Sequence, residues 1–433
     1  MSEGPIYVGI IGYGKIGTGA LKTLLDNQEN IDRKVGRQVR VKRLVDVDWT
    51  SPRPFAIDVP QEMKTTAADD VLEDPDISIV VETMGGTKPA REFVLKALQS
   101  GKNVVTSNKE LIARHGKELF EAAAERNLDL MFEASVGGGI PILRPLKQCL
   151  AANRISRIMG IVNGTTNFIL TKMAEGGAEF EEALKEAQRL GYAEPDPTND
   201  VEGFDAAFKL AILGSIAFES RVQVEDIYRE GIAKVGARDM EYARQLGYAV
   251  KLLAIGAEVD GALEMRVHPT LLPTGHPLAA VGGPFNAIFV RGSSIGEVMF
   301  YGQGAGTMPT GSAVVGDIID VARNIRSGAT GRIACTCFEG RHVKPMDEVT
   351  TRHYLRLQVA DRPGVLAAIA KVFGEEGVSL SSVLQMDASG ESAEIVWLTH
   401  PAQEGRMRRS LARLEKLDEV EEISSWIRAE TEG

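Results

Sequence analysis

An aspartate and a lysine four residues apart stand in an otherwise apolar stretch near the middle of the chain. The stretch, 202–218, reads Glu-Gly-Phe-Asp-Ala-Ala-Phe-Lys-Leu-Ala-Ile-Leu-Gly-Ser-Ile-Ala-Phe, with the pair at Asp205 and Lys209. In a helix, the neighbours on the face of Lys209 are apolar, so the ammonium is expected to be buried. Burial lowers the pKa of a lysine and a nearby carboxylate raises it, and the balance can produce a proton donor. The alternative is an ordinary exposed ion pair, which the apolar flanks disfavour.

Two polar segments upstream could hold ligands. Lys109 follows an expected strand end, the edge at which parallel α/β sheets bind ligands, although a solvated lysine in the first turn of a helix explains it equally well. Residues 133–141 read Glu-Ala-Ser-Val-Gly-Gly-Gly-Ile-Pro. Their carbonyls, together with Glu133, could coordinate a hard monovalent cation, or the glycines could simply form a flexible connection.

Residues 163–167, Asn-Gly-Thr-Thr-Asn, follow an expected strand at 158–162 and open another helix. Their amides and hydroxyls could stabilise a substrate carboxylate at the helix start. The simpler explanation is helix capping by Thr165 or Thr166.

An acidic loop precedes the Asp205 helix. Residues 190–197 read Leu-Gly-Tyr-Ala-Glu-Pro-Asp-Pro and lead through Asp200 into that helix. The two prolines restrict the backbone, so Glu194 is expected to be held in place, as a carboxylate that receives an ammonium should be. A proline turn that merely caps a helix is the alternative.

The N-terminal part has the pattern of a dinucleotide-binding domain. An apolar run at 6–11 precedes Gly12-Tyr-Gly14-Lys-Ile-Gly17 and a helical pattern at 18–25. The glycines would permit a tight turn, backbone approach to a pyrophosphate and close packing of helix on strand, in that order. The alternation continues with strands at 39–45, 77–81, 104–106 and 128–132 and helices at 90–99 and 110–125. This predicts a doubly wound parallel sheet; a glycine turn without a ligand is the alternative.

The preferred dinucleotide stays open. Asp46, at the end of the second expected strand, could accept hydrogen bonds from an adenosine ribose, which favours NAD. Arg53 could instead bind the 2′-phosphate of NADP. We expect NAD slightly more and allow both.

Composition limits the classes of partner. A chain of 433 residues is long enough for two or three domains. The net charge of −11 disfavours nucleic acid or an anionic membrane as the main partner. No basic leader or membrane-length apolar span is visible, so a cytoplasmic protein is expected. The cysteines Cys149, Cys335 and Cys337 are too few for a disulfide framework or a zinc site and are expected to be small buried residues.

Taken in order, these motifs closely resemble the homoserine dehydrogenase family over roughly residues 5–330. The most specific part is the Gly-Tyr-Ala-Glu-Pro-Asp-Pro loop followed by Asp205 and Lys209. The resemblance implies reversible, NAD(P)H-dependent reduction of L-aspartate 4-semialdehyde to L-homoserine, on the way to threonine and methionine. It also implies a dinucleotide-binding domain at 1–132 with 305–330 returning to it, and an α+β catalytic and dimerisation domain with a mixed sheet at 133–304.

The same resemblance implies roles for individual residues. Lys209 would give a proton to the aldehyde oxygen, with Lys109 near the nicotinamide and Asp205 as a further catalytic group. Acidic Asp46 and Asp48 replace a basic residue often found there, which puts NADP preference in doubt. Substrate contacts would be Gly164, Thr165, Tyr192, Glu194, Asp200 and Asp205. Dinucleotide contacts would be Gly12, Gly14, Lys15, Ile16, Gly17, Asp46, Thr83, Lys109, Gly191, Gly304 and Gly306. Glu133 with the carbonyls of Val136, Gly138 and Ile140 would hold a structural Na⁺.

The C-terminal part forms a separate pattern. After a linker at 331–351, residues 352–433 predict a βαββαβ unit that includes Asp-Arg-Pro-Gly-Val-Leu at 361–366. This unit resembles an ACT domain, which implies pairing into a homodimer or homotetramer and feedback by an amino acid, threonine being the expected effector. A dimerisation module that binds nothing is the alternative.

Two rival functions are weaker. An aspartate-semialdehyde dehydrogenase would need a nucleophilic cysteine, but Cys149 stands in a helical pattern without a glycine turn or companion histidine. A non-catalytic sensor of redox state and an amino acid offers no reason for Lys209.

Overall fold

The computed structural model describes residues 4–389 and 392–431, and the chain divides into two compact units. Unit 1 comprises Met1–Ile155, Ala211–Val224 and Arg291–Gly340; unit 2 comprises Ser156–Leu210, Glu225–Val290 and Arg341–Gly433. The domain boundaries expected from the sequence, at 132, 304 and 351, stay predictions.

Unit 1 contains a six-stranded parallel sheet in the order β3-β2-β1-β4-β5-β6. In these strands, buried β-branched residues follow one another with less alternation with glycine and polar residues than in a half-exposed sheet. This is expected for strands that are covered on both faces. The strand order confirms the doubly wound dinucleotide-binding fold. The strands are β1 (Ile6–Ile11), β2 (Val39–Val45), β3 (Lys64–Thr65), β4 (Ile77–Glu82), β5 (Asn103–Thr106) and β6 (Leu130–Met131).

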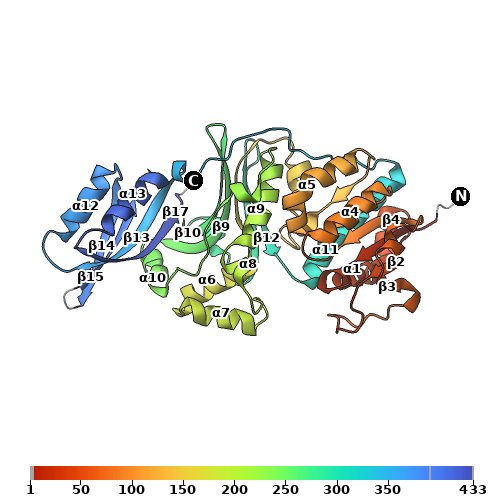
Figure 1. Cartoon of the computed structure of the whole chain (residues 1–433), viewed down its shortest axis with the longest axis horizontal. Coiled ribbons are helices and arrows are strands. Elements are labelled where there is room, and N and C mark those ends of the chain that lie inside the picture. The colour runs from red at the N-terminus through yellow and green to blue at the C-terminus, as the bar shows by residue number, and fades with distance from the viewer. Residues whose placement is uncertain (1–3, 390–391, 432–433) are drawn as a thin grey trace. The chain divides into compact units, whose positions relative to one another are not determined.

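Helices cover this sheet, and one of them comes from far along the chain (Figure 1). They are α1 (Lys15–Asp26), α2 (Gln28–Val35), α3 (Asp69–Leu72), α4 (Lys88–Gln99), α5 (Lys109–Ala124) and α11 (Thr307–Ser327). Helix α11 shares a buried core with α1, α2 and the sheet. Its Gly311 meets Gly19 of α1 so closely that a Cβ on Gly311 would lie 2.6 Å from the Gly19 carbonyl carbon.

Unit 2 contains a mixed sheet in which strands follow the order β11-β7-β9-β10-β17-β13-β15-β14. The first part comprises β7 (Ile155–Ile161), β9 (Tyr248–Val259), β10 (Ala262–Pro273) and β11 (Phe285–Gly292), with the short β8 (Tyr228–Arg229) beside β10. The associated helices are α6 (Gly164–Gly176), α7 (Phe180–Arg189), α8 (Thr198–Val201), α9 (Phe204–Ala217) and α10 (Ala237–Gln245). Strand β12 (Gly296–Gln303) belongs to unit 1.

The C-terminal part of unit 2 has the βαββαβ order expected of an ACT domain. Its elements are β13 (Thr350–Ala360), α12 (Val365–Glu375), β14 (Leu380–Ser389), β15 (Ser392–Thr399), β16 (Ala402–Gln403), α13 (Glu404–Leu414) and β17 (Val420–Ala429). Helices α12 and α13 pack on one face of its sheet around the buried Trp397 and Phe373 (Figure 1). Strand β17 also pairs in parallel with β10, which makes one continuous sheet of the two parts.

Two expectations need correction. The strand expected at 128–132 is only β6, because Phe132 and the residues after it turn into a short 3-10 helix. Cys149 is exposed rather than buried, and Cys335 and Cys337 are half-buried.

Within the described residues, no helix has the length and apolarity that a membrane crossing requires.

Candidate active site

Lys209 is buried in unit 2, as its apolar neighbours predicted. The side chains of Lys209 and Asp205 are each only 10% exposed on helix α9. The Lys209 Nζ lies 2.7 Å from Asp205 Oδ2 and donates a second hydrogen bond of 2.6 Å to the carbonyl oxygen of Val162. An ammonium has three N–H groups, so this geometry leaves one donor for a substrate atom.

Asn163 organises the acidic groups around this lysine. Its Nδ2 donates to Asp200 Oδ1 at 2.6 Å and to Asp205 Oδ2 at 2.9 Å. Its Oδ1 accepts a hydrogen bond of 2.9 Å from the backbone N–H of Thr166. The cap of helix α6 is therefore Asn163, and the expected caps Thr165 and Thr166 are wrong. The signal was present in the sequence, since asparagine directly before a helix is among the strongest caps.

The electrostatic balance of the cluster is negative. Burial raises the pKa of Asp200, and the nearby charge of Asp205 raises it further. With both carboxylates ionised, two negative charges face the single positive charge of Lys209. A substrate ammonium would neutralise the excess, so the cluster is suited to an amino-acid substrate.

The acidic loop is anchored through its backbone, not through Glu194. Thr165 Oγ1 donates to the Tyr192 carbonyl oxygen at 2.6 Å, and the rings of Tyr192 and Phe168 lie 4.8 Å apart. Glu194 is exposed, and no other described residue pairs with its carboxylate, so the expectation that it is held needs correction: only its carbonyl oxygen is bonded, to Gln188 Nε2 at 3.3 Å.

Two glycines flank the Asn163 cluster. A Cβ on Gly164 would lie 2.6 Å from the Pro284 carbonyl oxygen, which explains glycine at the first position of α6. Gly191 is exposed and has φ +78°, so it serves the turn after α7. The expected cofactor contact of Gly191 is not tested by this geometry, which shows only the turn.

The glycine turn of unit 1 has the geometry expected of a pyrophosphate site. Gly12 has φ +98°, and its carbonyl oxygen accepts a hydrogen bond of 2.6 Å from Thr83 Oγ1. A Cβ on Gly17 would lie 2.3 Å from that same oxygen, so helix α1 can approach only because residue 17 is glycine. Gly14 instead faces open space at the start of α1, where free backbone N–H groups attract an anion. Lys15 and Ile16 form the first turn of that helix.

Asp46 and Arg53 lie together beyond strand β2. Arg53 Nη2 is 3.5 Å from Asp46 Oδ2, and its guanidinium lies 5.7 Å from the centre of the Tyr13 ring. A carboxylate for a ribose and a guanidinium for a phosphate are therefore both present, and NAD and NADP both stay possible.

Lys109, Gly304 and Gly306 also belong to unit 1. Lys109 is half-buried at the first position of α5, where Asn108 caps the helix by accepting from the Leu111 N–H at 3.0 Å. Gly306 precedes α11 with φ +124°. The Gly304 carbonyl oxygen would be only 2.4 Å from a Cβ on Gly138, so these two backbones touch.

The carboxylate of Glu133 is fully occupied. Its oxygens accept hydrogen bonds from the N–H groups of Ile142, Leu143 and Arg144 at 2.6, 2.8 and 2.7 Å. The expected cation site with Glu133 and the carbonyls of Val136, Gly138 and Ile140 stays a prediction. Within the described part of the chain, no group of three His, Cys, Asp or Glu side chains could hold a metal ion.

Three protein-family models match separate stretches of the chain. Residues 12–133 match the model "Homoserine dehydrogenase, NAD binding domain", residues 141–319 match "Homoserine dehydrogenase", and residues 353–419 match "ACT domain". These matches cover the glycine turn, the Lys209 cluster and most of the C-terminal βαββαβ unit.

Individual relatives extend over the whole chain. A homoserine dehydrogenase from Bacillus subtilis is 44% identical over 430 residues, covering 99% of each chain. The crystal structure of a homoserine dehydrogenase from Thiobacillus denitrificans has a TM-score of 0.93 at 42% identity, again with 99% of each chain covered. A hyperthermophilic archaeal homoserine dehydrogenase in complex with NADPH has a TM-score of 0.62 at 30% identity and covers 73% of this chain and 97% of its own.

The glycine turn on a doubly wound sheet identifies a binding domain for a nicotinamide dinucleotide, and the C-terminal part is an ACT domain. With family matches on both larger domains and relatives of more than 40% identity along its full length, the chain belongs to the homoserine dehydrogenase family and is an oxidoreductase.

Proposed function

We propose that the chain catalyses the reversible reduction of L-aspartate 4-semialdehyde to L-homoserine, a step toward threonine and methionine. The observation that carries this proposal is the buried ammonium of Lys209, held by Asp205 and the Val162 carbonyl with one donor left over. The names of the relatives support the choice of substrate.

Lys209 would act on the substrate oxygen. A bound nicotinamide dinucleotide supplies the hydride, and its arrival at the aldehyde carbon places negative charge on the oxygen. The remaining N–H of Lys209 stabilises that charge and then transfers its proton, giving the alcohol. In the reverse direction, the neutral amine accepts the proton of the hydroxyl group. Asp205 holds the amine in position through the hydrogen bond of 2.7 Å.

The acidic residues around Lys209 would recognise the amino acid. The ammonium would contact Asp200, Asp205 and the exposed carboxylate of Glu194. Gly164, Thr165 and Tyr192 would be further substrate contacts, and Thr165 Oγ1 already donates to the Tyr192 carbonyl oxygen. Replacing Glu194 with Gln should therefore raise the KM for homoserine by roughly tenfold, with a smaller effect on kcat. An unchanged KM would remove Glu194 from the substrate contacts.

The dinucleotide would bind at the glycine turn of unit 1. Its pyrophosphate would lie over Gly12, Gly14, Lys15, Ile16 and Gly17, with Lys109 near the nicotinamide. Thr83, Asp46, Gly191, Gly304 and Gly306 complete the proposed contacts. Because Asp46 and Arg53 favour different cofactors, we propose that both NAD and NADP support turnover. Arg53→Ala should lower kcat/KM for NADP more than for NAD.

A structural Na⁺ would bind the carbonyl oxygens of Glu133, Val136, Gly138 and Ile140. Positive φ angles at Gly137 (+74°) and Gly138 (+53°) turn this backbone, which is compatible with convergent carbonyls. Such an ion would order the loop. Exchange of Na⁺ for a large organic cation should then lower thermal stability.

The remaining proposals concern assembly and control. The ACT domain suggests an amino-acid effector, for which we propose threonine, and a homodimer or homotetramer. We also propose a cytoplasmic location and the domain limits 1–132 with 305–330, 133–304, the linker 331–351, and 352–433. Light scattering with and without threonine tests the assembly.

One assay tests the central proposal. Initial rates of homoserine oxidation should be measured with NAD and with NADP, each with and without threonine. Activity is expected with at least one dinucleotide. No oxidation with either would remove the proposed reaction.

A variant of Lys209 tests the mechanism. Lys209→Met should lower kcat by roughly 10²- to 10⁴-fold, the range of general acid catalysis, while dinucleotide affinity is retained. Lys172→Met, on the exposed side of α6, is the matched control and should keep full activity. Retained turnover in the Lys209 variant would assign the proton transfer elsewhere.

A further inference from the structure

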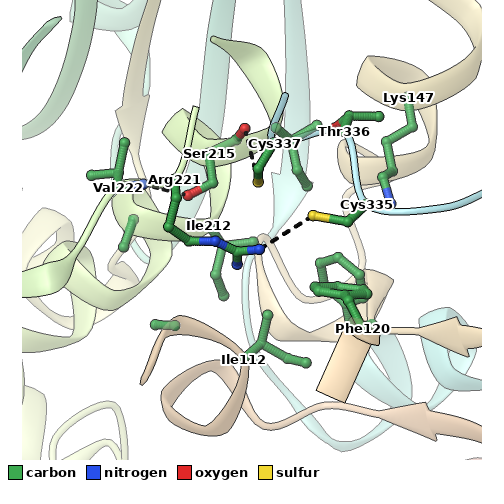
Figure 2. Close-up of a pocket in the computed structure, with 14 residues that line it drawn as sticks. Ile112, Phe120, Lys147, Ile212, Ser215, Arg221, Val222, Cys335, Thr336 and Cys337 are labelled. Carbon is green, nitrogen blue, oxygen red and sulfur yellow. Dashed lines mark hydrogen bonds between the residues drawn. The ribbon is translucent and has the colours of Figure 1, made fainter. Parts of the chain in front are cut away.

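A pocket in unit 1 contains two cysteines that the proposed reaction does not use (Figure 2). Cys335 and Cys337 lie on either side of Thr336 in a segment without helix or strand structure. The cavity they line is about 20 Å³, which is room for about one water molecule. Its other walls are largely apolar and include Ile112 of α5 and Ile212 of α9.

The two thiols are in contact with each other. Cys335 and Cys337 interact through their side chains and through the backbone N–H of Cys337. Cys337 Sγ also lies 3.7 Å from the Ser215 carbonyl oxygen. Because the two cysteines are two residues apart and line the same pocket, a bond between their sulfurs needs no large rearrangement of the chain.

Cations surround the sulfur of Cys335. Arg221 Nη2 donates to it at 3.3 Å, and Figure 2 shows the sulfur pointing toward that guanidinium. Lys147 lies close by, with its Nζ 5.6 Å from the ring centre of Phe120 and 5.4 Å from that of Phe132. The hydrogen bonds from Cys337, followed by the charges of Arg221 and Lys147, lower the pKa of Cys335 to about 5. The pKa of Cys337 is raised in turn, so Cys335 is the more acidic of the two thiols.

We propose that Cys335 and Cys337 form a dithiol site that reduces small hydroperoxides and closes into a disulfide. The thiolate of Cys335 attacks a peroxide oxygen, the O–O bond breaks, and the leaving oxygen takes a proton from water. Cys335 is now a sulfenic acid. The sulfur of Cys337 then attacks it, the S–O bond breaks, and hydroxide leaves with a proton as water. Two thiols and one hydroperoxide thus become one disulfide, one alcohol or water, and one water.

The surroundings favour this chemistry over metal binding. A soft metal cation would also suit two sulfur ligands, but the guanidinium of Arg221, 3.3 Å from the Cys335 sulfur, opposes it. The cavity has room for a molecule of about the size of water or hydrogen peroxide. We therefore expect selectivity for hydrogen peroxide over large organic hydroperoxides.

The full chain carrying Cys149→Ser tests the proposal, because Cys149 is exposed and would otherwise react as well. Treatment with one equivalent of hydrogen peroxide should remove both remaining thiols and two hydrogen atoms of mass, and dithiothreitol should restore both. Further replacement of Cys337 with Ser should stop the reaction at the sulfenic acid, seen as one added oxygen that dimedone traps. Further replacement of Cys335 with Ser should slow peroxide consumption by roughly tenfold or more.

Two measurements distinguish activation of the Cys335 sulfur from a purely structural role of the residues around it. Arg221→Met should slow the reaction by roughly tenfold, and Arg221→Lys should restore most of the rate. The parent itself should react with iodoacetamide with a midpoint near the pKa of about 5. A midpoint near pH 8 to 9, retention of both thiols under peroxide, or equal rates in the Cys335→Ser variant would each overturn the proposal.

Discussion

Lys209 and Lys251 lie in unit 2 with similar surroundings but different partners. As whole residues, Lys209 is 8% exposed and Lys251 is 6% exposed. Each Nζ donates a hydrogen bond of 2.6 Å to a backbone carbonyl oxygen, that of Val162 for Lys209 and that of Val281 for Lys251. Lys209 also touches the carboxylate of Asp205, whereas the nearest side-chain oxygen to Lys251 is the amide Oδ1 of Asn167, at 3.4 Å.

The two lysines differ in the polar groups that replace the water lost on burial. Burial lowers the pKa of Lys251 to about 8, and the distant charge of Glu175 offsets little of this. At Lys209 an ion pair with the Asp205 carboxylate replaces lost water. In the proposed mechanism, burial alone therefore does not suit a lysine to proton transfer, and the carboxylate one turn away is also needed.

The largest effect is expected when the carboxylate that distinguishes Lys209 from Lys251 is removed. Asp205→Asn leaves Lys209 bonded chiefly to a carbonyl, as Lys251 is, and should lower kcat for homoserine oxidation by roughly 10²-fold. Asp226→Asn, an exposed acid of the same unit, is the charge-matched control. Equal kcat values for the two variants would show that the carboxylate is unimportant.

The next effect concerns Lys251 and the pH dependence of folding. Its folded pKa of about 8 lies below the ordinary value of 10.5, so between these pH values the unfolded chain binds more protons. Stability should therefore rise with pH across this window, by up to about 3 kcal/mol. Lys251→Met should flatten the rise, whereas Lys172→Met should not. Urea unfolding at pH 7 and pH 10 measures the change in the free energy of unfolding. The same rise with pH in both variants would contradict the prediction.

The smallest effect sharpens the comparison by loosening Asp205 without removing it. Asn163→Ser keeps a capping oxygen for α6 but loses the amide that bridges Asp200 and Asp205. We expect kcat to fall by roughly tenfold, with a loss of unfolding free energy of about 1 kcal/mol. Asn163→Ala, which also loses the cap, should cost more stability at a similar kcat. If the Ser variant keeps full kcat, the bridge does not position Asp205.

The pattern of apolar residues was sufficient to predict the main elements. Strands β1 and β2 begin and end at the predicted residues, because buried runs bounded by glycine or charged residues leave little choice. The burial of Lys209 followed in the same way from its apolar helix neighbours.

Contacts between distant polar groups could not be predicted. Asn163, Thr165 and Thr166 are all good capping residues, and only the position of the Asp205 carboxylate shows why Asn163 is used. The carboxylate of Glu133 turned toward the N–H groups of 142–144, and no local pattern distinguishes that from a cation ligand. The cations around Cys335 come from residues 147 and 221, far away in sequence.

The pairing of α11 with α1 has a consequence for how the protein is made. Residues 314–322 complete the core around β1 and α1, so the dinucleotide-binding part cannot finish folding when its own sheet leaves the ribosome. An apolar face of α1 therefore stays uncovered by α11 until almost three quarters of the chain has been synthesised. Nascent chains should therefore depend on chaperones during this interval, and truncation before α11 should yield aggregates rather than a small stable domain.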